Sequence, residues 1–253
     1  MIKYLNFFLE IDKLKKMRKK GWIWRGVKNS ETMAQHTFRV ALMNWFLAKE
    51  VKPRLNLEKV IKASLVHDLC EVYAGDMTPR WGLLPKDPKK RKEFLKKRVR
   101  LPKELREKRW KIKFKKEKES LEKLIKNLEP QLGKEIMDNW LDCEVPFSRE
   151  GRFTRQGDKV EPLIQAIEYF GPKPMVTAWW EEMKDSVDHP VLTDFLKEIE
   201  EKFYTKSKKT YPLLDFITKI GMLKFFPRRS WIFRGIKNPE TIADHSFMVA
   251  LMV

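Results

Sequence analysis

Residues 64–76 read SLVHDLCEVYAGD, and this stretch decides how the rest of the chain is interpreted. Its apolar positions follow the spacing of a helix that buries one face. His67, Asp68 and Glu71 nevertheless crowd one side of that helix, because residues three and four apart face the same way. A lone His-Asp pair is most often a hydrogen-bonded surface cluster, since short motifs recur by chance. The stretch therefore predicts a helix that carries either such a cluster or a chemical site.

Three further residues favour a chemical site. His36 lies on a preceding amphipathic pattern, Asp76 follows a helix-ending Gly75, and Asp158 lies far downstream. Imidazoles and carboxylates together are the ligand set of a divalent transition metal, with open positions for water and substrate. Pro162 cannot donate a hydrogen bond to the carbonyl of residue 158, so the helix there should kink or restart. Asp158 then either caps the restarted helix or turns its carboxylate toward the His-Asp helix.

Helical periodicity dominates the chain, and no run of alternating β-branched residues indicates a strand. The sequence predicts Asn29 or Ser30 as the N-cap of the helix that holds His36, and Asn56 as the N-cap of the helix that holds His67. These patterns predict an all-α fold. The expected helices cover residues 4–15, 30–50, 57–74, 118–128, 131–141, 153–170, 175–186 and 190–203.

Composition excludes several classes of protein. The chain has 253 residues, of which 54 are Lys or Arg and 35 are Asp or Glu. No stretch approaches the roughly 20 apolar residues that a membrane-spanning helix requires, and the N-terminus lacks the features of a signal peptide. Cys70 and Cys143 form neither a disulfide framework nor a CxxC metal knuckle. We therefore expect a cytoplasmic protein without a membrane partner, built from one large domain or two small ones.

Residues 86–118 form a basic segment that holds 18 Lys and Arg against 5 Asp and Glu. Runs of like charge mostly remain solvated, so the segment predicts a partly helical surface. An anion-attracting flap or a nucleic-acid footprint is the alternative. Phe94, Trp110 and Phe114 interrupt the charges and suit either the docking of a helix or the stacking of bases. Composition alone does not choose between these readings.

An internal repeat divides the chain. Residues 22–43 return as residues 231–252 at an offset of 209 without a gap, and fifteen of the twenty-two positions are identical. We predict a complete domain over residues 1–206 and the N-terminal helices of a second, truncated repeat over residues 207–253. The polar stretch 204–210 is the predicted linker.

The second copy lacks most of the candidate metal ligands. His245 reproduces His36, but the counterparts of the His-Asp pair and of Asp158 would lie beyond Val253. One imidazole cannot hold a catalytic divalent ion, so we expect one ion per chain. The apolar helix that ends at Val253 should pack on the first domain, pair with another chain or remain poorly ordered. Homodimerisation is therefore left open at this stage.

Taken together, these motifs resemble those of the HD-domain metal-dependent phosphohydrolases. His36, LVHDLCEVYAGDMTP at 65–79 and RFTRQGDKVEPLIQAIEYF at 152–170 carry the resemblance, which is nearest to the 5′-deoxynucleotidase branch. It covers residues 1–203, interrupted by the basic segment, and implies an HD-type helical bundle with a basic helical insertion. Gly21 stands where some members have Arg, a departure that bears on phosphate binding and specificity.

The resemblance also implies three groups of functional residues. The metal ligands of the family fall on His36, His67, Asp68 and Asp158. The carboxylates that position or activate water fall on Glu71 and Asp76, and the substrate-binding positions on Trp22 and Arg25. HD enzymes with several ions add histidines between the His-Asp pair and the distal Asp, and residues 69–157 contain none. One divalent ion is therefore expected, whether Co²⁺, Mn²⁺, Mg²⁺ or Zn²⁺.

The implied reaction is hydrolysis of (deoxy)nucleoside 5′-monophosphates by a metal-activated water, with a triphosphohydrolase as its close variant. No Ser or Cys nucleophile with an adjacent base is evident, so a covalent intermediate is not expected. His189 lies in an Asp-His-Pro turn signal and is interpreted as structural. The alternative function is an HD protein that binds nucleic acid, or acts on oligonucleotides or dNTPs, through residues 86–118. A protein that only binds nucleic acid has no need for the full set of six polar site residues, so their presence disfavours that function. The six are His36, His67, Asp68, Glu71, Asp76 and Asp158.

Overall fold

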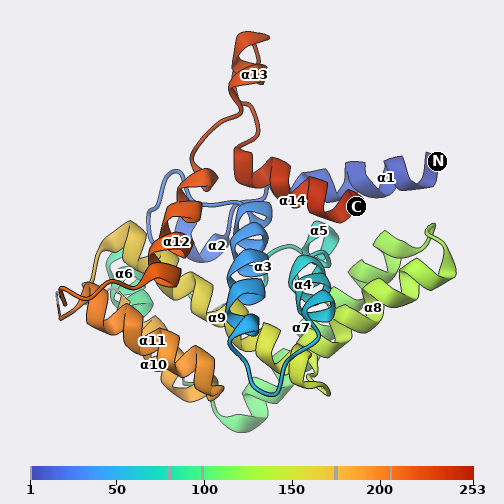
Figure 1. Cartoon of the computed structure of the whole chain (residues 1–253). Coiled ribbons are helices and arrows are strands. Elements are labelled where there is room, and N and C mark those ends of the chain that lie inside the picture. Colours follow the sequence, from blue (N-terminus) through green and yellow to red (C-terminus); the bar gives the residue numbers. More distant parts are fainter. Residues whose placement is uncertain (1, 79–80, 98–99, 174–175, 206) are drawn as a thin grey trace.

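The computed structural model describes residues 2–253 except 79–80, 98–99, 174–175 and 206. The described residues form helices joined by turns, with isolated bridges but no strand among them (Figure 1). The predicted all-α fold is confirmed. Not one of the described helices is both long enough and apolar enough to cross a membrane.

The elements follow one another closely along the chain. In order they are α1 (Ile2–Ile11), the 3₁₀ helix η1 (Asp12–Lys15), α2 (Lys20–Ile23), α3 (Met33–Lys49), α4 (Leu57–Val66), α5 (Glu71–Ala74), α6 (Pro88–Lys96), α7 (Lys103–Ile125), α8 (Pro130–Glu144), α9 (Arg149–Phe170), α10 (Thr177–Ser186), α11 (Pro190–Phe203), α12 (Pro212–Gly221), the 3₁₀ helix η3 (Met222–Lys224), α13 (Arg229–Phe233) and α14 (Ile242–Met252).

Helix α3 lies at the centre of the molecule and packs against α4, α9, α12 and α14 (Figure 1). Every residue from Met33 to Ala41 is buried. One hydrophobic cluster contains Met43 of α3 together with residues of α9 and α11. A second cluster contains Phe38 of α3 together with residues of α4, α7 and α14. His36 is therefore placed deep in the protein, on a helix that two cores hold rigid.

Helix α3 begins at Met33 because Thr32 caps it, so the predicted N-cap at Asn29 or Ser30 is wrong. The Thr32 hydroxyl accepts from the backbone nitrogen of Gln35 at 3.1 Å, and the Gln35 side chain accepts from the backbone nitrogen of Thr32 at 2.9 Å. This capping box satisfies two amides at once. Thr32 has an extended backbone and forms an isolated bridge with Arg18, 14 positions earlier in the sequence.

The predicted helix over residues 57–74 is divided into α4 and α5 by a turn over residues 67–70. Asn56 is the N-cap as predicted, since its side chain accepts from the backbone nitrogen of Lys59 at 3.1 Å. The ring of His67 donates from Nδ1 to the carbonyl of Ser64 at 2.7 Å. In a continuous helix the Ser64 carbonyl would accept a hydrogen bond from a backbone amide of the next turn. Because the His67 ring occupies this acceptor, the helix ends here.

Helix α9 runs from Arg149 to Phe170 through Pro162. The prediction was a kink or a restart at this proline; the restart does not occur, and Asp158 lies inside the helix rather than at a cap. The Asp158 carboxylate faces His36 of α3. The alternative in which Asp158 only caps a restarted helix is therefore wrong.

The described part of the basic segment forms α6 and the first two thirds of α7, mostly exposed to solvent. Phe114 of α7 stacks on Trp140 of α8, with ring centroids 5.5 Å apart, and on Trp110 at 5.0 Å. Leu121 and Leu124 continue the buried side of α7. Phe114 thus helps α7 to dock on α8. Helix docking was one of the two predicted roles of the aromatic residues in the basic segment.

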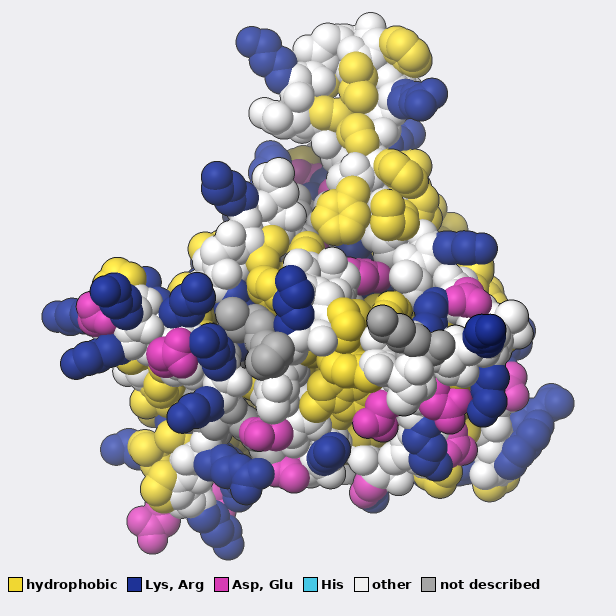
Figure 2. All heavy atoms as spheres, turned by 90° about the vertical axis from the view of Figure 1, so that its left-hand side faces the viewer, with side chains coloured by type: hydrophobic (Ala, Val, Ile, Leu, Met, Phe, Trp, Pro, Cys, Tyr) yellow, Lys and Arg dark blue, Asp and Glu magenta, His cyan; other side chains and the backbone are white. Residues whose placement is uncertain are grey.

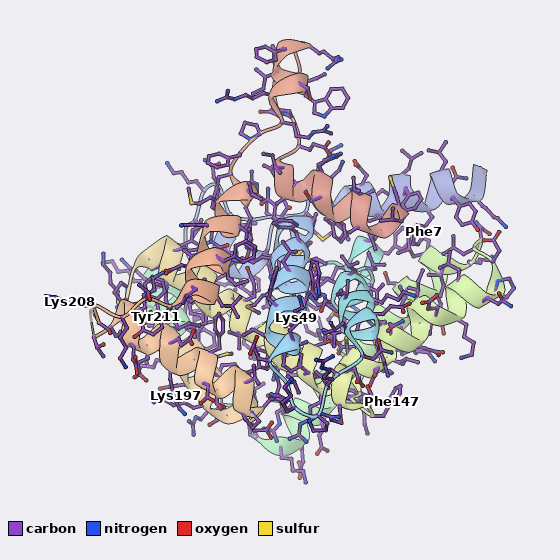
Figure 3. All side chains as sticks on the ribbon, in the orientation of Figure 1. Phe7, Lys49, Phe147, Lys197, Lys208 and Tyr211 are labelled. Carbon is purple, nitrogen blue, oxygen red and sulfur yellow. The ribbon has the colours of Figure 1, made fainter. Side chains whose placement is uncertain are left out.

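The C-terminal residues fold back on the rest of the chain. Helix α14 packs on α3 and α4. Its Phe247 lies in the same buried cluster as Phe7 of α1, and Phe7 is labelled in Figure 3. Of the three predicted outcomes for this helix, the structure shows packing on the preceding part of the chain, here on α3 and α4. Helix α13 projects from the surface (Figure 1), with exposed hydrophobic side chains that Figure 2 shows at its tip. Phe233 is 86% exposed there.

Candidate metal centre and active site

The two histidines and two aspartates predicted as metal ligands converge between α3, α4 and α9. The Nε2 atom of His36 lies 3.0 Å from Oδ1 of Asp158 and 3.8 Å from Oδ2 of Asp68. The Nε2 atom of His67 lies 3.3 Å from the same Asp68 oxygen and 3.4 Å from the same Asp158 oxygen. The packing of α3 against α9 brings together His36 and Asp158, which are 122 residues apart in the sequence.

Each imidazole is fixed by a partner on its Nδ1 atom. Nδ1 of His67 donates to the carbonyl of Ser64 at 2.7 Å, and Nδ1 of His36 pairs with Oε2 of Glu161 at 2.5 Å. A proton on Nδ1 leaves the lone pair on Nε2. Such partners orient the rings of metal-binding histidines and make them more basic. Both rings therefore present a ligating nitrogen toward the same point.

This donor set fits a divalent metal ion. The ligand atoms of His36, His67 and Asp158 all lie within 4.8 Å of one another. Within the described ranges, Nε2 of His67 is buried and has no hydrogen-bond partner. Its lone pair faces carboxylate oxygens of Asp68 and Asp158 at 3.3 and 3.4 Å, and a cation between these acceptors would neutralise their repulsion. Two imidazole nitrogens and two carboxylate oxygens are ligands that Zn²⁺ and related ions accept.

Charges of both signs meet at this point. Burial opposes ionisation of Asp68 and Asp158, but the neighbouring imidazoles outweigh it and hold the pKa of both carboxyl groups below the usual range. Burial also opposes the charge on Lys19, yet Asp68 and Asp158 raise the pKa of its ammonium group. Nζ of Lys19 lies 3.8 Å from Oδ2 of Asp68. The site thus combines anionic ligand groups with a fixed cation.

Glu71 and Asp76 lie beside the four candidate ligands in different environments. Oε2 of Glu71 is buried and has no hydrogen-bond partner among the described residues. Burial, followed by repulsion from Asp68 and Asp76, raises the pKa of Glu71 well above its usual range. Oδ2 of Asp76 instead accepts from the backbone nitrogen of Lys20 at 2.6 Å, at the first residue of α2. Glu71 therefore has an oxygen available for proton transfer, whereas one oxygen of Asp76 holds α2.

Trp22 and Arg25, the predicted substrate-binding residues, belong to an aromatic layer around Trp179. Trp22 is 2% exposed, stacks on Trp179 with ring centroids 5.0 Å apart, and donates from Nε1 to Glu31 at 2.8 Å. The guanidinium of Arg25 lies 4.2 Å from the centroid of the Trp179 ring and donates to the carbonyl of Leu95 at 3.2 Å. Trp22 is thus a core residue here, and Arg25 joins the turn after α2 to α6.

Three residues that support this centre, Glu161, Arg39 and Lys19, were not predicted from the sequence. Oε1 of Glu161, the carboxylate that pairs with His36, accepts from Nε of Arg39 at 2.7 Å. A signal was available, because Arg39 follows His36 by three residues and Glu161 follows Asp158 by three, on two helices that face each other. Lys19 carries no comparable signal, because it lies in a lysine-rich stretch.

Comparison with known proteins confirms the predicted family. The chain belongs to the HD domain family, whose model matches residues 11–199 and 220–253. It is 26% identical over 199 residues to human 5′-deoxynucleotidase HDDC2, which covers 78% of this chain and 84% of that protein. It is 28% identical over 211 residues to 5′-deoxynucleotidase HDDC2 of Dictyostelium discoideum, which covers 79% of this chain and 98% of that protein.

A solved structure shares the fold. It is described as a predicted metal-dependent phosphohydrolase from Magnetospirillum magnetotacticum MS-1, and it superposes with a TM-score of 0.50. The match has 20% sequence identity and covers 87% of this chain and 96% of the other. The helical arrangement described above is therefore one that is known from experiment.

Proposed function

We propose that the protein is a metal-dependent phosphohydrolase that removes phosphate from (deoxy)nucleoside 5′-monophosphates. The convergence of the two histidines and two aspartates carries this proposal. The relatives named 5′-deoxynucleotidase, which match over most of both chains, support the substrate class. In this proposal one divalent ion, whether Co²⁺, Mn²⁺, Mg²⁺ or Zn²⁺, is held by His36, His67, Asp68 and Asp158.

The residues around the ion divide the work of hydrolysis. A bound divalent ion lowers the pKa of water and polarises a phosphoryl oxygen. Glu71 takes a proton from the attacking water through Oε2, which has no hydrogen-bond partner in the part of the chain that the structure describes. Such a role typically contributes about 10²–10⁴-fold to the rate. Lys19 neutralises phosphate oxygens from its position 3.8 Å from Asp68, in a chain that has Gly21 where some family members have Arg. Asp76 holds the start of α2 and thereby orients Lys19.

Trp22 and Arg25 form the nucleoside side of the proposed site. Because Trp22 is 2% exposed, it supports the aromatic layer from behind rather than stacking directly on a base. Trp179 and Arg25 are half-buried and lie nearer the surface. They are therefore the groups that a base or sugar would reach first.

The remaining parts of the chain have supporting roles in this proposal. The packing of Phe114 on Trp140 favours helix docking over base stacking, so the basic segment attracts anionic nucleotides by its charge rather than binding nucleic acid. Residues 1–206 form the phosphohydrolase unit. Residues 207–253 form the first helices of a second HD repeat, which the family match over 220–253 supports.

Phosphate release from a panel of ribo- and deoxynucleoside 5′-monophosphates tests the proposal. The protein is stripped with a chelator and reloaded separately with Co²⁺, Mn²⁺, Mg²⁺ or Zn²⁺, and triphosphates serve as comparators. We expect release from monophosphates only after reloading, with a modest dependence on salt. Tight binding of an oligonucleotide that weakens steeply with salt, without phosphate release, would support the nucleic-acid alternative instead.

A further inference from the structure

The C-terminal repeat docks on the first domain through contacts that are reciprocal between equivalent residues. Positions in the two copies differ by 209, so Lys224 and Glu240 correspond to Lys15 and Glu31. Nζ of Lys15 lies 2.6 Å from Oε2 of Glu240. Lys224 makes the equivalent ion pair with Glu31. Each copy therefore offers its lysine to the glutamate of the other.

The starts of α3 and α14 repeat this reciprocity. Thr32 and Gln35 correspond to Thr241 and Asp244, and each pair forms a capping box. Oγ1 of Thr32 donates to Asp244 at 2.9 Å, and Nε2 of Gln35 donates to Thr241 at 3.0 Å. In a two-fold interface, if residue i of one subunit contacts residue j of the other, then residue j of the first subunit contacts residue i of the second. The second copy thus lies on the first as one subunit lies on the other in a two-fold dimer.

The two halves of this interface differ in their surroundings. The side chains of Lys15 and Glu240 are each 16% exposed, whereas those of Lys224 and Glu31 are fully buried. Nζ of Lys224 also donates to Oε1 of Glu161 at 2.6 Å. Lys224 therefore enters a buried cluster of carboxylates, while its equivalent Lys15 remains near the surface.

Glu161 connects that cluster to the candidate metal centre. Its Oε2 pairs with Nδ1 of His36, and its Oε1 accepts from both Arg39 and Lys224. The side chains of Glu161, Arg39 and Lys224 are all fully buried, so both cations contact this carboxylate away from solvent. A charged carboxylate on one nitrogen of an imidazole fixes the ring and makes the other nitrogen a better ligand.

We propose that Lys224 is a positioning residue for the metal centre, supplied to the first domain by the second repeat. Lys224 holds Glu161, Glu161 orients His36, and His36 directs Nε2 toward the ion. This inference rests on the metal-binding role proposed above for His36. It couples the docking of residues 207–253 to metal affinity, and the coupling is reciprocal.

The test compares Lys224→Met with Lys15→Met, the matched control that removes the equivalent ion pair. Full-length proteins are stripped and titrated with Co²⁺ against a chelating indicator, and the visible absorption of bound Co²⁺ is recorded. We expect Lys224→Met to weaken Co²⁺ binding by about 10–100-fold and to alter the spectrum, as is usual when the outer partner of a metal ligand is lost. Lys15→Met should leave affinity and spectrum unchanged.

A second variant covers the case in which Lys224→Met does not fold, because that change leaves buried carboxylates without their cation. The double variant Glu31→Gln/Lys224→Met balances the charge, yet Oε1 of Glu161 still loses one of its two donors and keeps only Arg39, so weaker Co²⁺ binding is again expected. Wild-type affinity and spectrum in a folded Lys224 variant would overturn the inference and leave the proposed function standing. Equal weakening by Lys15→Met would also overturn it. Failure of the wild-type protein to bind Co²⁺ would contradict both.

Discussion

Replacing Gly157 with alanine should separate α9 from α3 and displace the neighbouring Asp158. A Cβ atom at position 157 would lie 1.8 Å from Oδ1 and 2.7 Å from Cγ of Asn44. Asn44 is fully buried and donates from its side-chain amide to Ser64 at 3.0 Å, which restrains it from turning aside. Because non-bonded heavy atoms lie about 3.5–4.0 Å apart, the helices must part by about 1–2 Å.

The expected loss of stability follows from two opposing contributions. Overpacking a core costs about 1–3 kcal/mol, and the higher helix propensity of alanine returns about 0.5–1 kcal/mol. The free energy of unfolding should therefore fall by up to about 2.5 kcal/mol, as measured by denaturant titration. Since Asp158 moves with the helix, Co²⁺ affinity should fall too, and turnover should fall by about 10²-fold, the cost of a displacement near 1 Å.

Gly133→Ala is the matched control for this experiment. Gly133 also lies inside a helix, but the nearest atom to its added Cβ would be the carbonyl oxygen of Ile125 at 3.8 Å. This change should stabilise the protein by about 0.5–1 kcal/mol and leave metal affinity unchanged. Wild-type stability and wild-type Co²⁺ affinity in Gly157→Ala would refute the close packing of α3 on α9 that aligns Asp158 with His36.

Three further perturbations address individual groups. Glu71→Ala should keep near-stoichiometric metal by elemental analysis and lose kcat by about 10²–10⁴-fold; wild-type turnover would assign the proton transfer to another group. Shortening residues 88–112 should raise KM and reduce its response to salt, since the segment acts by long-range attraction; a collapse of kcat at constant KM would contradict this. His245→Ala should leave one ion and full activity, because Nδ1 of His245 faces Arg228 at 3.0 Å; loss of a second ion would show a separate site.

The four candidate metal ligands were predictable because they are carried by motifs whose spacing reflects helix geometry. His67 and Asp68 are adjacent in the sequence, His36 lies in a strong helical pattern, and Asp158 lies in a helical pattern that Gly157 and Pro162 interrupt. The resemblance to a family supplied the remaining step, since spacing alone does not say that α3 and α9 face each other. Their convergence depends on packing between residues 122 positions apart.

Other features could not be predicted because they arise from tertiary contacts. Thr32, the N-cap of α3, forms a bridge to Arg18. The break after α4 accompanies the hydrogen bond from the His67 ring to a backbone carbonyl. Lys224 is one lysine among many in the sequence. Its burial depends on Glu31 and Glu161, which lie 193 and 63 residues away. No local pattern encodes a contact of that range.

Metal content and phosphate release of Asp68→Ala, measured side by side with the wild-type protein, test the central claim most directly. Oδ2 of Asp68 lies 3.3 Å from Nε2 of His67 and 3.8 Å from Nε2 of His36, so its removal takes away one of the four proposed ligands. The wild-type chain should hold one divalent ion and release phosphate from deoxynucleoside 5′-monophosphates. The variant should keep its helical circular dichroism spectrum and lose both the ion and the activity. A variant that retains a full ion and wild-type phosphate release would contradict the account.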